Sequence, residues 1–141
     1  MVKKMTDFDK NAVMKSYGRC CVKPEFWDRF YDIFQDSAPE IRPMFADTDF
    51  DRQKEIINES LNFVLIYAKD PNNVVAKKKL EKIADIHSRH RVNVRPDMYK
   101  YWIDSLLQTI QEFEKDNYTM ELEKNWRAAL SPAIELLKSR Y

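Results

Sequence analysis

Apolar residues recur along most of this chain at the three- and four-residue spacing that is typical of amphipathic helices. The clearest stripe consists of Phe50, Ile57, Leu61, Val64 and Leu65. It stops at residues 70–73, where the sequence Asp-Pro-Asn-Asn disfavours a helix. Thr48 or Asp49 can cap its start, because such a side-chain oxygen accepts a hydrogen bond from a backbone N–H of the first turn. The pattern therefore predicts a long helix between these two signals.

The first half of the chain contains two further helical patterns and a short turn. Apolar positions predict one helix over roughly residues 7–22. Pro24 fits the first position of a second helix, where the missing N–H has no partner to lose. Pro39 follows a break in that second pattern, and we expect it to open a short helical turn toward Met44 and Phe45.

Three more helical patterns follow in the second half of the chain. One carries apolar residues on a single face that ends at His87, and a polar connection leads from it to Pro96. A long helix then extends to a break at residues 114–117. In the last helix Pro132 lies inside the pattern, and we expect it to bend the helix because proline removes one backbone hydrogen bond.

Composition strengthens the helical interpretation. Glycine occurs once, at Gly18, whereas β-hairpins and tight strand–helix turns usually need glycine. The 141 residues match the usual size of one domain. We therefore expect an all-α fold in which about six to seven helices surround one core.

Charge and hydropathy exclude several classes of partner. The formal net charge is +1, so no basic excess points to a nucleic-acid or anionic-membrane partner. No apolar run reaches the ~20 residues of a membrane helix, and the N-terminus lacks the apolar core of a secretory signal. A cytoplasmic location is expected. The adjacent Cys20 and Cys21 agree with it, because neighbouring cysteines rarely form a disulfide and reduced thiols are normal in the cytosol.

Candidate chemistry is sparse. His87 and His90 are spaced as a zinc pair could be, but zinc usually needs three or four ligands and the sequence has no third histidine. It also lacks a nucleophile–base constellation and a glycine-rich phosphate loop. A non-covalent haem needs only one neutral imidazole and an apolar slot. Taken alone, Tyr31 and Gln53 would be a core tyrosine and an exposed helical glutamine.

Several short stretches stand in a distinctive order along the chain. They are residues 30–34, Pro39, Phe45, Gln53, Ile57, Leu61, residues 83–89, residues 94–99 and Trp126. Tyr31 lies eight positions before Pro39, and Phe45 lies six positions after it. His87 is followed by the sequence Val-Arg-Pro-Asp-Met-Tyr at residues 94–99. In this order and spacing, essentially the whole chain resembles the globin family, specifically the bacterial single-domain haemoglobins.

The resemblance implies a globin-like fold, with residues 1–141 as a single globin domain around a haem pocket. It implies haem b (iron protoporphyrin IX) as the cofactor, with His87 as the proximal ligand that gives its Nε2 to the iron. Tyr31 and Gln53 would donate hydrogen bonds to bound dioxygen, which becomes partly superoxide-like, and Phe45 would stack on the porphyrin. The residues that the resemblance places around the haem are Tyr31, Phe45, Gln53, Ile57, Ile83, His87 and Tyr99.

Two features depart from the family pattern. The interval between His87 and Pro96 is longer than in many relatives, and His90 fits the shorter interval slightly better, which makes it the alternative ligand. We prefer His87 because it shares one helical face with the apolar residues before it. Globins often have small residues where the two helices with the distal groups cross, whereas Trp27 and Lys54 fall near that crossing here. These residues indicate one of two things: the two helices pack further apart at the crossing, or the alignment of this sequence with the family pattern is shifted by one residue.

Four functions are compatible with this interpretation. We favour reversible binding of dioxygen at a pentacoordinate iron, for storage, transport or scavenging. The second is nitric oxide dioxygenation, the one enzymatic candidate, which would need a separate reductase because the sequence to Tyr141 contains no flavin or nicotinamide domain. The third is gas sensing by a stand-alone globin, and the fourth is an interaction module without haem. Dioxygen, nitric oxide and carbon monoxide are the expected small ligands of a monomer or homodimer.

Overall fold

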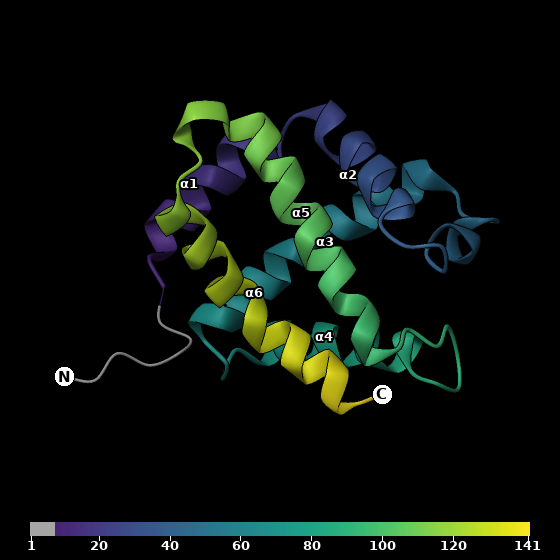
Figure 1. Cartoon of the computed structure of the whole chain (residues 1–141). Helices are drawn as coiled ribbons and strands as arrows, with labels where there is room; N and C mark the ends of the chain where they lie inside the picture. Colours follow the sequence, from purple (N-terminus) through teal and green to yellow (C-terminus); the bar gives the residue numbers. More distant parts are fainter. Residues whose placement is uncertain (1–7) are drawn as a thin grey trace.

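The computed structural model describes residues 8–141 and contains only helices and their connections over that range (Figure 1). Six α-helices account for most of it. They are α1 (Lys10–Cys20), α2 (Pro24–Asp36), α3 (Phe50–Lys69), α4 (Val74–His87), α5 (Tyr99–Glu114) and α6 (Met120–Ser139). Three short 3-10 helices are η1 (Arg42–Phe45), η2 (Pro96–Met98) and η3 (Lys115–Asn117). The all-α architecture expected from the sequence is confirmed.

Side-chain caps and one proline set the starts of four helices. Asp9, Asp49 and Asn73 each precede a helix, and their side chains accept hydrogen bonds from backbone N–H groups of the first turn of α1, α3 and α4 respectively. Of the two caps expected for the long apolar stripe, Asp49 is the one that the structure uses. Pro24 lies in the first turn of α2, as expected from its fixed φ and its missing N–H.

The first helix is shorter than the sequence pattern predicted. It begins at Lys10, because Asp9 caps it, and it ends at Cys20 rather than at Val22. The predicted start at Asp7 lies outside the described residues. Val22 is one of the exposed large apolar side chains, so burial gives it no reason to extend the helix.

The short turn expected to open at Pro39 begins there, as a turn over residues 39–41, and continues as η1, which has Pro43 in its first turn and ends at Phe45. One other boundary differs from the expectation. Glu114 was expected in a breaking stretch but is the last residue of α5. The chain leaves the helix at Lys115, whose φ of 54° lies in the left-handed region.

The core is formed where α6 crosses α3 and where α2 packs on α5. Figure 1 shows α5 and α6 in front of α3, and α3–α6 and α2–α5 are in extensive contact. Trp126 of α6 is fully buried, and its indole N–H donates a hydrogen bond of 2.9 Å to the Ser16 hydroxyl of α1. Because this bond satisfies the one polar atom of the indole, the tryptophan can lie at the centre of the core. α6 continues through Pro132.

The crossing of α2 and α3 is less close than the other helix contacts. In the described part of the chain these two helices are not among the pairs in extensive contact. Trp27 of α2 is buried, and the Lys54 ammonium of α3 lies 2.7 Å from the Asp28 carboxylate of α2. The structure thus has few close approaches between these two helices, and the wider packing and the shifted register considered from the sequence both stay predictions.

None of the helices within residues 8–141 has both the length and the apolar character that crossing a lipid bilayer requires.

Candidate functional site

The polar centre of one candidate group is a hydrogen bond between α2 and α3. The Gln53 side-chain amide, in the first turn of α3, donates to the Tyr31 hydroxyl across 3.1 Å. Tyr31 is 4% exposed, and its burial raises the pKa of the phenol to about 12, while the bond from Gln53 opposes the rise. The hydroxyl therefore keeps its proton at neutral pH. The Gln53 amide donates to the hydroxyl oxygen and does not accept the hydroxyl proton. The proton of Tyr31 is therefore free to be donated to another group.

Aromatic rings surround this hydrogen bond. The ring of Phe45, from η1, lies edge-on to Tyr31 with centroids 5.5 Å apart. Phe50 lies at 5.4 Å from Tyr31 and stacks on Phe45 at 5.9 Å. We call Tyr31, Phe45, Phe50 and Gln53 the Tyr31 group. Phe50 was recognised from the sequence only as part of an apolar stripe, although it lies three positions before Gln53 and thus on the same helical face.

The second candidate group centres on His87, the last residue of α4. Its Nδ1 lies 3.1 Å from the Tyr99 hydroxyl at the start of α5. Burial lowers the pKa of His87 to about 4, so the ring is neutral at pH 7. In the tautomer in which Nδ1–H donates to Tyr99, the lone pair of Nε2 is free to bind a metal. Ile83 lies one turn before His87, and we call Ile83, His87 and Tyr99 the His87 group.

Half-buried apolar side chains connect the two groups. The core divides into three apolar clusters. Each residue of one half-buried set packs against two of these three clusters. That set consists of Phe34, Phe45, Ile83, Val94, Trp102 and Ile103. Ile57 is buried in the same cluster as Tyr31, while Tyr99 belongs to a second cluster, and Ile83 packs against both. Large apolar side chains that are only half covered indicate a place where a flat apolar ligand could complete the packing.

The structure thus brings the expected site residues together in two sets. Hydrogen bonds and ring contacts link Tyr31, Phe45 and Gln53, and a hydrogen bond links His87 and Tyr99. These contacts join residues within each group rather than residues of different groups.

The alternative histidine lies in a different environment. His90 is exposed to solvent in the turn after α4, whereas His87 is largely covered within the helix. Within residues 8–141, no group of three or more His, Cys, Asp or Glu side chains is placed to hold a metal ion. A zinc site built on His87 and His90 therefore lacks further ligands among these residues.

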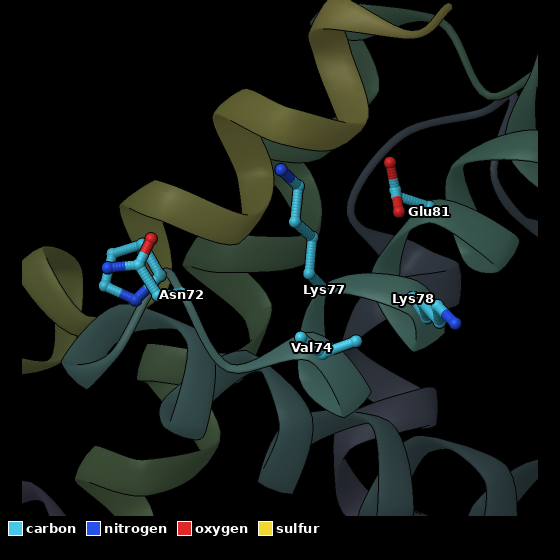
Figure 2. A pocket seen from close by; sticks show the side chains of 6 residues that line it. Asn72, Val74, Lys77, Lys78 and Glu81 are labelled. Carbon is cyan, nitrogen blue, oxygen red and sulfur yellow. The ribbon is translucent and has the colours of Figure 1, made fainter.

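Two surface hollows lie away from both groups. One of about 290 Å³ lies at the start of α4, and Figure 2 shows its lining side chains. They are Pro71, Asn72, Val74, Lys77, Lys78 and Glu81. The other, of about 510 Å³, is lined by Lys23, Glu25, Arg29, Glu112, Phe113 and Lys115. None of the residues expected at the functional site lines either hollow.

Comparison with known proteins assigns the family. No family model matches the sequence, and no curated protein matches it. A solved crystal structure matches with a TM-score of 0.85 and 34% sequence identity, covering 94% of this chain and 97% of the other. That protein, from Pseudomonas aeruginosa PAO1, is described as structurally highly homologous to a human hemoglobin. The helices are those of an all-α globin-like fold. At this identity and coverage, the chain belongs to the globin family.

Proposed function

We propose that this protein binds haem b between its Tyr31 and His87 groups and that it binds dioxygen reversibly. The observation that carries the proposal is that a neutral imidazole and a hydroxyl lie beside apolar clusters that share half-buried side chains. The proton of that hydroxyl has no intramolecular acceptor among the described hydrogen bonds. The proposal takes residues 1–141 as one globin domain. A cytoplasmic location and a monomeric or homodimeric state belong to the same proposal.

The side chains present fit a haem. His87 offers a neutral ring nitrogen, and Tyr99 holds the other nitrogen, which would fix the orientation of the imidazole. The half-buried Phe45 and Ile83 supply apolar surface of the kind that a porphyrin would cover. In this arrangement a single protein ligand is sufficient, because a porphyrin brings four nitrogen ligands of its own to the iron.

The Tyr31 group fits the recognition of a polar diatomic gas. When bound, haem supplies an iron at which such a gas binds and from which it leaves. Tyr31 would donate its hydroxyl proton toward the gas, because its acceptor side is already engaged by Gln53. The raised pKa of Tyr31 keeps this donor protonated over the physiological range. Ile57, one turn beyond Gln53 and buried, would limit the space beside the gas. Nitric oxide and carbon monoxide would enter the same site.

The direct test is gas binding by the purified full-length protein after hemin is supplied. We expect uptake of one hemin per chain, followed after reduction by an absorption spectrum that changes with oxygen and returns under argon over several cycles. Oxidation of the iron within the first cycle, or an absorption spectrum that does not change when oxygen is added, would contradict reversible oxygen binding. Absence of hemin uptake would contradict the cofactor itself.

A further inference from the structure

The turn that follows His87 is folded back onto the end of α4. The backbone N–H of Val94 donates to the His87 carbonyl across 2.8 Å, and the N–H of Asn93 donates to the Ser88 carbonyl across 2.9 Å. Asn93 has a φ of 60°, in the left-handed region, which asparagine adopts more readily than most residues other than glycine. Contacts from another segment of the chain add to these local hydrogen bonds.

Those contacts come from the residues at the end of α6. The Tyr141 hydroxyl donates a hydrogen bond to the side-chain oxygen of Asn93. The backbone N–H of Arg89 donates to the Tyr141 carbonyl across 3.2 Å, and the Arg89 guanidinium lies 4.8 Å from the centre of the Tyr141 ring. Figure 1 shows the C-terminal end of α6 beside the loop that connects α4 to α5. The turn is thus held at both of its ends.

A second contact joins the end of α6 to α4, at a residue that comes before His87 in the sequence. The Arg140 guanidinium lies 2.6 Å from the Glu81 carboxylate, six positions before His87 on α4. α6 is itself anchored in the core, since Ile134 and Leu137 are buried in one cluster with Ala84 and Tyr99. The end of α6 therefore links a rigid part of the core to the segments before and after His87.

We propose that Arg140 and Tyr141 are positioning residues for His87, which hold the end of α4 and the turn after it so that the imidazole keeps one orientation. The inference rests on the proposed role of His87 as the haem ligand. An imidazole at the last residue of a helix would otherwise follow the fraying of that helix end. We call the four contacts of Arg140 and Tyr141 with Glu81, Arg89 and Asn93 the C-terminal clamp.

The test removes one atom from the clamp and follows the His87 backbone in the full chain without haem. In Tyr141→Phe, which keeps the ring against Arg89, hydrogen exchange of the Val94 amide is expected to be roughly three- to tenfold faster. Asn93→Gly, which tolerates the positive φ but lacks the acceptor, should give a similar acceleration. The double variant should be no faster than the quicker single variant, because both remove the same bond. Unchanged exchange in Tyr141→Phe would overturn the clamp.

The second measurement follows the iron–imidazole stretching band of the reduced, haem-loaded protein. Tyr141→Phe should shift or broaden this band and speed haem loss to an acceptor protein several-fold, about threefold or more. Tyr118→Phe, which removes a tyrosine hydroxyl bonded to Glu123 near the start of α6, should change neither. A band identical to that of the unmutated protein would overturn the positioning role. Failure of the unmutated protein to take up hemin would instead refute the proposed function, because the exchange measurement needs no haem.

Discussion

The side-chain amide of Gln53 donates a 3.1 Å hydrogen bond to the hydroxyl of Tyr31, which lies 22 positions earlier in the chain. The direction of this bond matters, because the amide fills an acceptor position of the hydroxyl and leaves its proton unused. In the proposed function, Gln53 would therefore support Tyr31 as a donor to a bound gas, in addition to any hydrogen bond of its own. Two predictions follow if Gln53 acts on the gas through Tyr31.

Tyr31→Phe should speed dioxygen dissociation from the reduced, haem-loaded protein. The variant keeps the ring contacts with Phe45 and Phe50 and removes only the donor. Loss of one hydrogen bond to a charged group corresponds to about 1.5–3 kcal/mol, which predicts a rate roughly ten- to hundredfold higher in stopped-flow measurements. Tyr17→Phe is a matched control, because that hydroxyl bonds to Asn58 elsewhere. An unchanged rate in Tyr31→Phe would remove Tyr31 from the mechanism.

Gln53→Leu should have a smaller effect, and the two substitutions should not add. Removing a supporting neutral hydrogen bond corresponds to about 0.5–1.5 kcal/mol, or roughly a two- to tenfold faster dissociation. Once Tyr31 is phenylalanine, the amide has no hydroxyl to support, so Gln53→Leu should then change the rate less than it does alone. Fully additive effects of the two substitutions would indicate that Gln53 and Tyr31 act on the gas independently.

Local signals in the sequence were sufficient for most of the fold. The apolar stripe before residue 70, the Asp49 cap and the proline at position 24 each act through near neighbours, and the structure has the corresponding helices where they were predicted. Periodicity placed His87, and not His90, on the apolar face of a helix, and the structure has His87 as the last residue of α4. The choice of His87 as the haem ligand stays a prediction. That Tyr31 and Gln53 share a site was expected from resemblance to a family rather than from the residues themselves, and the hydrogen bond between them was not predicted.

Contacts between distant segments could not be predicted in this way. Glu114 was interpreted as part of a helix break, because a glutamate at the start of the polar stretch 114–117 carries no signal of burial. Its carboxylate is buried because Arg19, 95 positions away, binds both of its oxygens at 2.6 Å. The clamp formed by Tyr141 was missed for the same reason, since its acceptor Asn93 lies 48 positions away. Such pairs depend on how the helices pack.

Arg19→Met should destabilise the protein measurably. Burial alone would raise the pKa of Glu114, but hydrogen bonds from Arg19 and Ser16 outweigh it and hold the pKa below its usual range. Removing Arg19 leaves a carboxylate with a side-chain exposure of 1% without its main partner. We expect the free energy of unfolding in guanidinium to fall by about 2 kcal/mol, since the half-exposed arginine gives less than a fully buried pair.

Arg29→Met provides the matched control for this prediction. Arg29 also binds a glutamate of α5 through two hydrogen bonds, at 2.9 and 2.8 Å to Glu112. Both partners of that pair are exposed, so its loss should lower stability by less than about 1 kcal/mol. Equal losses in the two variants would mean that burial of Glu114 does not determine the strength of its pair.

The stability of the haem-free protein should fall as the pH is lowered from about 6.5 toward 4 because of His87. Its pKa is about 4 in the folded chain owing to burial, against about 6.5 when unfolded. In that window the unfolded chain binds a proton that the folded chain does not, so stability decreases with falling pH, by up to about 3 kcal/mol. Denaturant unfolding at several pH values measures this. His87→Gln should remove this part of the pH dependence and His90→Gln should keep it; the reverse pattern would contradict the assigned burial of His87.

The most direct measurement is the absorption spectrum of the full-length protein titrated with hemin, compared among the unmutated chain, His87→Ala and His90→Ala. The account predicts that the unmutated chain and His90→Ala each take up one hemin and give the same intense Soret band. His87→Ala should bind hemin far more weakly and give a different spectrum. A preparation that stays colourless with hemin, or a His87→Ala spectrum identical to that of the unmutated protein, would contradict it.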